Sequence, residues 1–533
     1  MLRYPGQLGV RMKSFRARLC FSVIGLAFAA LPASAQTFRV EEATIADVHA
    51  AMKAGRLTCR VLVEAYLARI EAYDKKGPSL NAINLVNPNA LAEADAMDAG
   101  FKQKGMVGPL HCVPAIVKDN FETIGLQSAG GSLALKDFAS DKDAFQVKRI
   151  KEAGAIVLAK SSMAEWAFSP IETVNSLQPG YTLNPYALNR STAGSSGGTA
   201  AAVAANFGLI GLGSDTGDSI RGPSAHQALA GIRSTMGLTS RAGVIPLNLL
   251  ADIAGPMTRT LTDAVIVFQA IAGHDPADPA TAAAKGRKIP NYSGSLVAGG
   301  LKGARIGVLR QAYERDGEGV DPDVVNAFTA AVDALKLAGA EIIDPARVNL
   351  EGIRRNPDAG TCMGFKYDIN AWLASHGARI PMKTLDDVVA SRKFHPSVEV
   401  RLLNAQKAMP QGPDSDACKQ EFAYRKSFGD AVTKTMDEMK LTAFVYPTWS
   451  WPPRLIGDLN TPGGDNSQVF SPTSGFPAVN VPMGYTRGGR LPAGITFFGR
   501  AWDEATLIKL AYAYEQATKH RRPPESTPAL ATP

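Results

Sequence analysis

The segment of residues 189–223 constrains the fold of this chain most strongly, because it joins three predicted elements in one short stretch. Thr199–Phe207 is rich in alanine and is predicted to be a helix, and the apolar run Leu209–Leu212 is predicted to be a strand. Residues 213–218 hold two glycines and are predicted to turn. A helix followed at once by a strand indicates a fold in which helices cover a sheet.

Further units of helix and strand lie elsewhere in the chain. Asp143 is predicted to cap a helix that ends at Gly154, and a strand is predicted over residues 155–160. Another helix opens at Asp321 and leads to a strand at residues 341–344. Such units predict a layered α/β fold with much parallel strand pairing.

The first residues are typical of a secretory signal peptide. A basic lead precedes the apolar run Leu19–Leu31, which is too short to span a bilayer, and Ala33–Ala35 before Gln36 fits a small-residue cleavage site. We therefore expect residues 1–35 to be removed and residues 36–533 to form a soluble periplasmic or secreted domain. A membrane anchor or a buried helix is the alternative for the apolar run.

The basic charge of the chain belongs largely to this leader. The net charge of +8 falls to +3 without residues 1–35, because these hold five basic residues and no acidic one. No block of lysine and arginine with interleaved aromatic residues occurs, which argues against a nucleic-acid partner.

Four cysteines remain after the leader, namely Cys59, Cys112, Cys362 and Cys418. Export would permit disulfides, and four cysteines allow three full pairings. Their spacing is wide and irregular, so we expect mostly buried free thiols, with Cys362 and Cys418 the one pair to test. Neither C-x-x-C nor H-E-x-x-H occurs, so the sequence supports no metal site.

Lys118 comes directly after the apolar run Val113–Val117, which is predicted to be a buried strand. Burial disfavours the ammonium form of a lysine and lowers its pKa, so that a neutral amine could take a proton from a hydroxyl. The alternative is a lysine paired with Asp119 at a strand end. His111 and His226 are rival bases, and neither has a neighbouring pattern that requires it.

Ser195 and Ser196 lie among glycines at the start of the predicted alanine-rich helix, where N–H groups are unpaired and the partial charge is positive. Helix capping by both serines is the alternative. Residues 194–198 also match G-x-S-x-G, with Ser196 in the nucleophile position. The elbow of an α/β-hydrolase needs an apolar strand before it, and the preceding residues are polar, so we reject this interpretation.

The turn predicted after the strand can direct successive backbone N–H groups at one point, which suits a developing oxyanion. Gly217 can take a positive φ in it, and Ser219 would sit at its rim. A capped turn with no catalytic role is the alternative. Taken together, Lys118, the Ser195/Ser196 pair and Ser219 supply a base, a relay and a nucleophile without histidine.

These segments resemble the amidase signature family. Residues 114–123 (PAIVKDNFET) resemble its lysine segment, and residues 184–223 resemble its glycine- and serine-rich signature. Residues 251–264 and 475–518 resemble the segments that follow, whereas the resemblance is weakest between 273 and 441. The family implies an α/β fold with a large mixed β-sheet covered by helices on both faces.

The resemblance also implies the roles of individual residues. It implies a catalytic triad of base, bridging serine beside a cis peptide, and acylated nucleophile: Lys118, Ser195 and Ser219. It implies an oxyanion hole made by the backbone N–H groups of Thr216, Gly217, Asp218 and Ser219. Ser196 and Arg221 match supporting positions. The implied activity is hydrolysis of a carboxamide to a carboxylic acid and ammonia or an amine, without a metal or organic cofactor, and the family allows a homodimer.

The sequence departs from the family where Asp218 and Ala193 replace common glycines, and where Ser161 and Ser162 replace threonine and asparagine. The Asp218 carboxylate is expected to narrow the site or to repel anionic substrates, and the triad is unaffected. Residues 161–178 are expected to build part of the pocket. Three aromatic residues are expected either to line it or to belong to the core: Tyr446, Trp449 and Trp451.

Three other functions compete with amide hydrolysis. An esterase or carbamate hydrolase would use the same triad. A tRNA-dependent amidotransferase component is disfavoured by the signal peptide, and a non-catalytic exported binding protein is disfavoured by the retained triad. Peptide C-terminal amides, aryl amides and simple carboxamides all remain as substrate classes.

Overall fold

A mixed β-sheet of eleven strands carries the residues predicted to do chemistry. Its strands are β1 (Ile83–Val86), β2 (Pro114–Lys118), β3 (Ile156–Ser161), β4 (Ile210–Asp215), β5 (Ala230–Arg233), β6 (Ile253–Thr258), β7 (Arg305–Val308), β8 (Glu341–Ile343), β11 (Ala443–Pro447), β12 (Ala478–Thr486) and β13 (Leu491–Phe498). They are ordered β1-β3-β2-β4-β6-β5-β12-β13-β11-β7-β8. A separate small sheet pairs β9 (Thr361–Cys362) with β10 (Pro410–Gln411).

This computed structural model describes residue 9, residues 38–314 and residues 319–530. The chain from Phe38 onward forms one compact unit. The predicted signal peptide, residues 1–35, lies outside the described residues apart from Gly9. Within the described ranges, no helix is long and apolar enough to cross a membrane.

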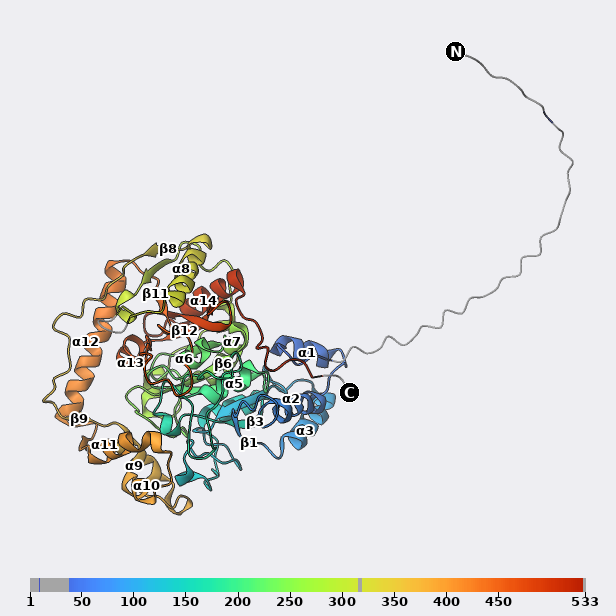
Figure 1. Cartoon of the computed structure of the whole chain (residues 1–533), viewed down its shortest axis with the longest axis horizontal. Coiled ribbons are helices and arrows are strands. Elements are labelled where there is room, and N and C mark those ends of the chain that lie inside the picture. The colour runs from blue at the N-terminus through green and yellow to red at the C-terminus, as the bar shows by residue number, and fades with distance from the viewer. Residues whose placement is uncertain (1–8, 10–37, 315–318, 531–533) are drawn as a thin grey trace, which may run out of the picture. The chain divides into compact units, whose positions relative to one another are not determined.

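Helices surround the sheet (Figure 1). They are α1 (Ile45–Lys53), α2 (Cys59–Tyr73), α3 (Ala90–Lys104), α4 (Phe145–Glu152), α5 (Gly197–Ala204), α6 (Arg221–Ala225), α7 (Leu261–Ile271), α8 (Pro322–Leu337), α9 (Phe365–Ser375), α10 (Leu385–Ser391), α11 (Glu399–Lys407), α12 (Asp416–Glu438), α13 (Phe470–Ser474) and α14 (Glu504–Thr518). Figure 1 shows α9, α10 and α11 together in orange, on the opposite side of the unit from α2 and α3 in blue.

Strand pairing is less parallel than the helix–strand units predict. β2 is parallel to both β3 and β4, and β7 is parallel to β8 and β11. The centre of the sheet is antiparallel, because β6 lies between β4 and β5, and β12 and β13 form a hairpin. The sheet is therefore mixed, and the parallel set at one end positions the ends of β2 and β4 side by side.

Local sequence signals account for several helix starts. The Asp321 side chain caps α8 by accepting a bond from the Asp323 N–H, with Pro322 at the first helical position. The prediction that Asp143 caps α4 is wrong. Ala144 precedes that helix without a side-chain cap, and the Asp143 carboxylate instead accepts from the Ile124 N–H at 2.9 Å and pairs with Lys151.

A second apolar cluster attaches the α9–α11 region to the main body. Ile369, Trp372 and Leu373 from α9 pack in the same buried cluster as Phe138 and Trp166. Trp372 Nε1 and His376 Nε2 also both contact the buried Glu122 carboxylate, at 3.2 and 3.1 Å. The divergent middle of the chain is therefore fixed to the body beside the site.

All four cysteines that follow the leader form disulfides. Cys362 is bonded to Cys418, the one pair singled out from the sequence, and Cys59 is bonded to Cys112. The expectation of mostly free thiols is wrong, because the fold brings the first residue of α2 beside the start of β2. That proximity has no trace in the linear spacing of the cysteines.

Candidate active site

Lys118 is the last residue of β2, and its side chain is fully buried. Its Nζ donates to Ser195 Oγ at 2.8 Å and to Ser214 Oγ at 2.9 Å. Burial lowers the pKa of Lys118 to about 7, although the charges of Asp215, Asp252 and Asp218 act to raise it. A lysine in this state can accept a proton near neutral pH.

Ser195 lies just before α5 and is also fully buried. The peptide bond between Gly194 and Ser195 is cis, as the family resemblance implies. The Ser195 hydroxyl is the group that contacts Lys118 directly. Ser196 points elsewhere, since its Oγ donates to the Ser214 carbonyl at 3.1 Å and accepts from the Ser214 N–H at 3.3 Å. Ser196 thus holds β4 against the start of α5.

Ser214 is a site residue that the sequence analysis does not identify. Its Oγ accepts from Lys118 Nζ and from Asn120 Nδ2, the latter at 3.0 Å. Lys118 therefore donates to two serine hydroxyls from neighbouring segments. The available signal is positional, because Ser214 follows the predicted strand Leu209–Leu212 within the segment that carries the family resemblance.

The turn that presents Ser219 begins later than predicted. β4 continues through Asp215, so residues 213–215 are strand and only 216–220 turn. Gly217 does not use the positive φ that glycine allows. An added Cβ at Gly217 would meet the amide end of the Gln468 side chain, which would have to move aside.

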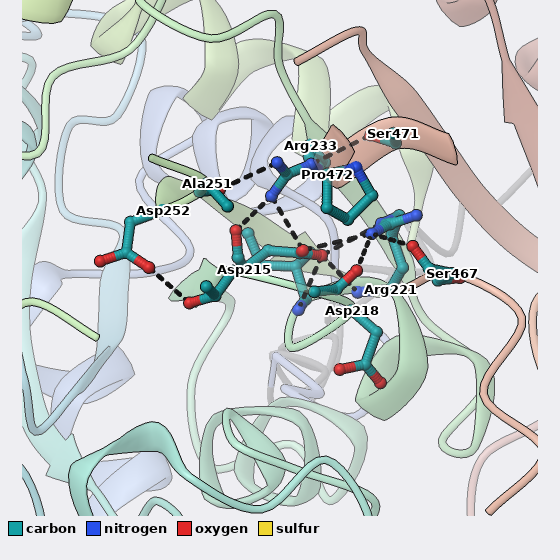
Figure 2. A network of polar contacts seen from close by, with 12 residues as sticks. Asp215, Asp218, Arg221, Arg233, Ala251, Asp252, Ser467, Ser471 and Pro472 are labelled. Carbon is teal, nitrogen blue, oxygen red and sulfur yellow. Dashed lines mark hydrogen bonds and ion pairs between the residues drawn. The ribbon is translucent and has the colours of Figure 1, made fainter. Parts of the chain in front are cut away.

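A buried ion-pair cluster holds this turn in place (Figure 2). The Asp215 carboxylate accepts from Arg221 Nε at 3.1 Å and from Arg233 Nη1 at 3.0 Å, and all three side chains are buried. These arginines, against the opposing effect of burial, lower the pKa of Asp215 to about 2. Arg221 also donates to the Gly217 carbonyl, and Thr216 Oγ1 donates to Asp252 at 2.5 Å. The backbone of the turn is therefore held rigidly.

The four N–H groups assigned to the oxyanion hole are those of Thr216, Gly217, Asp218 and Ser219. Within the described part of the chain, none of them donates a hydrogen bond to a backbone or side-chain acceptor. All four residues line one cavity of about 500 Å³. Donors that are unpaired and face a cavity can bind a developing negative charge there.

Ser219 is almost buried but reaches this cavity, with 5% of its surface exposed. Among the described residues, its hydroxyl makes no hydrogen bond with Lys118 or Ser195. The structure thus brings together Lys118, Ser195 and Ser214, and presents Ser219 separately on the cavity wall.

The Asp218 side chain is 1% exposed and faces the Asp465 carboxylate (exposed fraction 8%) and the Gln468 amide. Burial raises the pKa of Asp218 well above its usual range, and the neighbouring charge of Asp465 adds to this effect. Figure 2 shows the Asp218 carboxyl pointing away from the Asp215 cluster. Asp218, which stands where the family commonly has glycine, thus places its carboxyl group beside that of Asp465 in the cavity wall.

The rest of the cavity comes from separate parts of the chain. Ala167, Phe168, Pro170 and Ile171 line it, as expected for residues 161–178. The divergent middle adds three basic residues: Arg355, Arg401 and Arg425. The three aromatic residues considered for the lining, Tyr446, Trp449 and Trp451, do not contribute to it. Tyr446 is fully buried and belongs to the core rather than to the pocket lining.

Neither of the two histidines considered as alternative bases contacts Lys118, Ser195 or Ser219 in the described part of the chain. His226 is buried against the Trp449 ring at 4.8 Å, and burial lowers its pKa to about 4. His111 Nδ1 accepts from the Val107 N–H at 3.3 Å, and its ring lies tilted against the Phe101 ring, 5.4 Å between centroids. Among the described residues, Lys118 is therefore the basic side chain in contact with Ser195.

Comparison with known proteins places the chain in a family. A family model described as Amidase matches residues 61–508. A probable amidase of Arabidopsis thaliana is 34% identical over 513 residues, which cover 92% of each chain. A glutamyl-tRNA(Gln) amidotransferase component of Moorella thermoacetica is 33% identical over 482 residues, 86% of this chain and 94% of that protein.

Solved structures show the same fold. The native peptide amidase from Stenotrophomonas maltophilia matches with a TM-score of 0.80 at 35% identity, over 91% of this chain and 98% of that one. A peptide amidase in complex with the competitive inhibitor chymostatin matches with a TM-score of 0.79 at 36% identity, over 91% and 99%. The chain therefore belongs to the amidase signature family, whose members act on the carbon–nitrogen bonds of amides.

Proposed function

We propose that this protein hydrolyses carboxamides through Ser219, Ser195 and Lys118, by way of an acyl-enzyme. The observation that carries the proposal is the fully buried Lys118, whose Nζ lies 2.8 Å from Ser195 Oγ and 2.9 Å from Oγ of Ser214, the strand residue two before the turn that presents Ser219. A neutral amine at that position activates a hydroxyl relay without histidine.

In the proposed first half-reaction, Lys118 takes the proton of Ser195 while Ser195 takes the proton of Ser219. Ser219 Oγ then attacks the amide carbon, and the N–H groups of residues 216–219 bind the oxyanion. The proton returns through Ser195 to the nitrogen, the carbon–nitrogen bond breaks, and ammonia or an amine leaves. Water then hydrolyses the ester at Ser219 by the same relay, which releases the carboxylic acid.

We propose peptides with a C-terminal carboxamide as the substrate class. The support is the similarity to peptide amidases, which extends over nearly the whole of those chains. The same triad would also cleave esters and carbamates, so relative rates on matched amide and ester substrates belong in the first test.

The test measures ammonia release from peptide amides, simple carboxamides and matched esters by the protein from Gln36 onward. We expect turnover of peptide amides, and loss of about three or more orders of magnitude in kcat in Ser219→Ala. Equal turnover by Ser219→Ala would assign the chemistry to another residue. Transfer of ammonia to an acceptor, without net hydrolysis, would favour the amidotransferase alternative.

We also propose that the protein is exported after cleavage before Gln36. The two disulfides support this, because disulfides persist in oxidising compartments. Mass spectrometry of the protein from a periplasmic fraction is expected to give an N-terminus at Gln36. Recovery of the uncleaved chain from the cytoplasm would contradict export.

A further inference from the structure

A second cavity, of about 740 Å³, lies beside the candidate active site. It is bounded by the segment of residues 236–250, by residues 277–280, and by parts of α9 and α12. Its apolar lining includes Met236, Val244, Leu250, Met363, Trp372 and Phe422. A cavity of this size is large enough for a bulky organic group.

The charged residues of this apolar cavity are engaged with protein groups. Arg241 binds Asp278 through Nε at 2.9 Å and Nη2 at 2.6 Å. Asp368 Oδ2 accepts from the Leu249 N–H at 2.8 Å, its Oδ1 has no hydrogen-bond partner among the described residues, and burial, which disfavours the charged form, raises the pKa of Asp368 to about 7. The cavity therefore offers an apolar surface and suits an uncharged, apolar group.

The apolar cavity adjoins the catalytic cavity. Arg425 and Thr473 line both. Arg425 Nη1 donates to the Pro472 carbonyl at 2.8 Å and to the Thr473 carbonyl at 3.3 Å, while Arg425 Nε binds Glu421 at 2.9 Å. Arg425 Nη2 makes no hydrogen bond within the described residues, so it can donate to a carbonyl of a bound peptide.

The turn of residues 247–251 forms another part of the shared wall. Leu247, Asn248 and Ala251 line the catalytic cavity, whereas Leu249 and Leu250 line the apolar cavity. A substrate whose scissile carbon lies at Ser219 thus has an apolar space next to its acyl part.

We propose that the apolar cavity binds an aromatic or large aliphatic side chain of the substrate's acyl part, with Arg425 at the junction bonding to the substrate backbone. This proposal rests on the proposed function and specifies its substrates as peptide amides with a bulky apolar residue close to the scissile carboxamide. The apolar group gains binding energy from desolvation, and Ser219 reacts at the other end.

The test compares three amides of equal backbone length: N-acetyl-Gly-Gly-amide, N-acetyl-Gly-Phe-amide and N-acetyl-Phe-Gly-amide. We expect the enzyme to hydrolyse at least one of the two phenylalanine amides with a kcat/KM about 10- to 100-fold higher than that for the glycine amide. Ala371→Trp fills the apolar cavity from an exposed position on α9. We expect it to reduce this preference to about threefold or less and to leave the glycine amide unaffected.

Ala374→Trp is the matched control, because Ala374 is exposed on the same helix and does not line the cavity. If Ala371→Trp does not fold, Phe422→Ala, which removes an exposed wall residue, is expected to lower the preference as well. An unchanged preference in these variants, or an equal loss for all three amides, would overturn the proposal. A wild-type protein that hydrolyses none of the amides would instead contradict the proposed function itself.

Discussion

Lys118 is the residue on which the proposed chemistry depends most, because a buried amine acts as a base only after losing its proton. Burial lowers its pKa to about 7, so the neutral form dominates above that pH. We therefore predict that kcat/KM rises with pH through about 7 and then levels off. A pH–rate profile on a neutral peptide amide measures this. Lys118→Met is expected to lower kcat by about 100- to 10,000-fold. A profile that is flat around pH 7 would exclude Lys118 as the base.

Ser214 positions Lys118 and is expected to tune it. A hydroxyl that accepts from the ammonium form stabilises that form, so its removal lowers the pKa of Lys118. We predict that Ser214→Ala moves the acid limb of the rate profile to lower pH and lowers kcat about 10-fold, with little change in KM. Ser214→Thr keeps the hydroxyl and is expected to restore both. Identical pH profiles for wild type and Ser214→Ala would show that the contact is only structural.

The sequence identifies some of these residues and not others, for physical reasons. Lys118 and Ser195 stand in segments whose linear pattern carries the resemblance. Ser214 is one serine within a strand, and only the parallel pairing of β2 with β4 gives it a role. Backbone freedom suggests a turn at Gly217, whereas the sequence gives no sign that the Gln468 side chain packs against this glycine from the distant segment before α13.

At the scale of elements, the connection from β4 to α6 depends on buried charge. Asp215 is the acid that compensates both Arg221 and Arg233. We predict that Asp215→Asn lowers the free energy of unfolding by about 3–5 kcal/mol, because it leaves two buried guanidinium groups without a carboxylate. Urea unfolding of both proteins measures this. Asp430→Asn, which breaks an exposed pair with Lys426, is the control and should change stability little.

The buried pairing of Asp215 with Arg221 and Arg233 also makes the stability of the fold depend on pH. The folded-state pKa of Asp215 is lowered to about 2, so its contribution is complete above the pKa of an unfolded aspartate and is lost as the pH falls toward 2. Asp215→Asn should therefore flatten the acid side of the stability curve. A mutant as stable as the wild type at neutral pH would contradict this account of the turn.

Elements are predicted well where local signals are strong. Asp321 and Pro322 start α8 as expected, and the strand after Gly154 is β3. The prediction for Asp143 fails because a carboxylate near a helix start can bind another loop, here at Ile124. The antiparallel centre of the sheet is not predicted, since strand order depends on contacts between distant segments rather than on local pattern.

At the scale of the whole molecule, two disulfides tie distant segments together. Cys59–Cys112 spans 53 residues and Cys362–Cys418 spans 56. We predict that reduction lowers the free energy of unfolding by about 2–4 kcal/mol for each bond. Urea unfolding with and without reductant tests this, and Cys59→Ser with Cys112→Ser isolates the first bond. Free thiols in the unreduced protein would contradict the pairing.

The overall architecture follows from the resemblance, whereas the walls of the site do not. Residues between 273 and 441 resemble the family least, yet they supply α9, α12 and the arginines of the cavity. Their packing depends on the second apolar cluster and on Glu122, which binds Trp372 and His376 from α9 and the residue after it. Such long-range contacts have no local signature, so the substrate preference could not be predicted from the sequence.

The central claim is that Ser219 becomes acylated during turnover. The most direct measurement is rapid acid quenching of the enzyme with a peptide amide or its matched ester, followed by peptide mass spectrometry. The account predicts an adduct of the acyl mass on Ser219, formed in a burst before steady turnover and absent in Ser219→Ala. An adduct on Ser195 or Ser196, or turnover with no covalent intermediate on any serine, would contradict it.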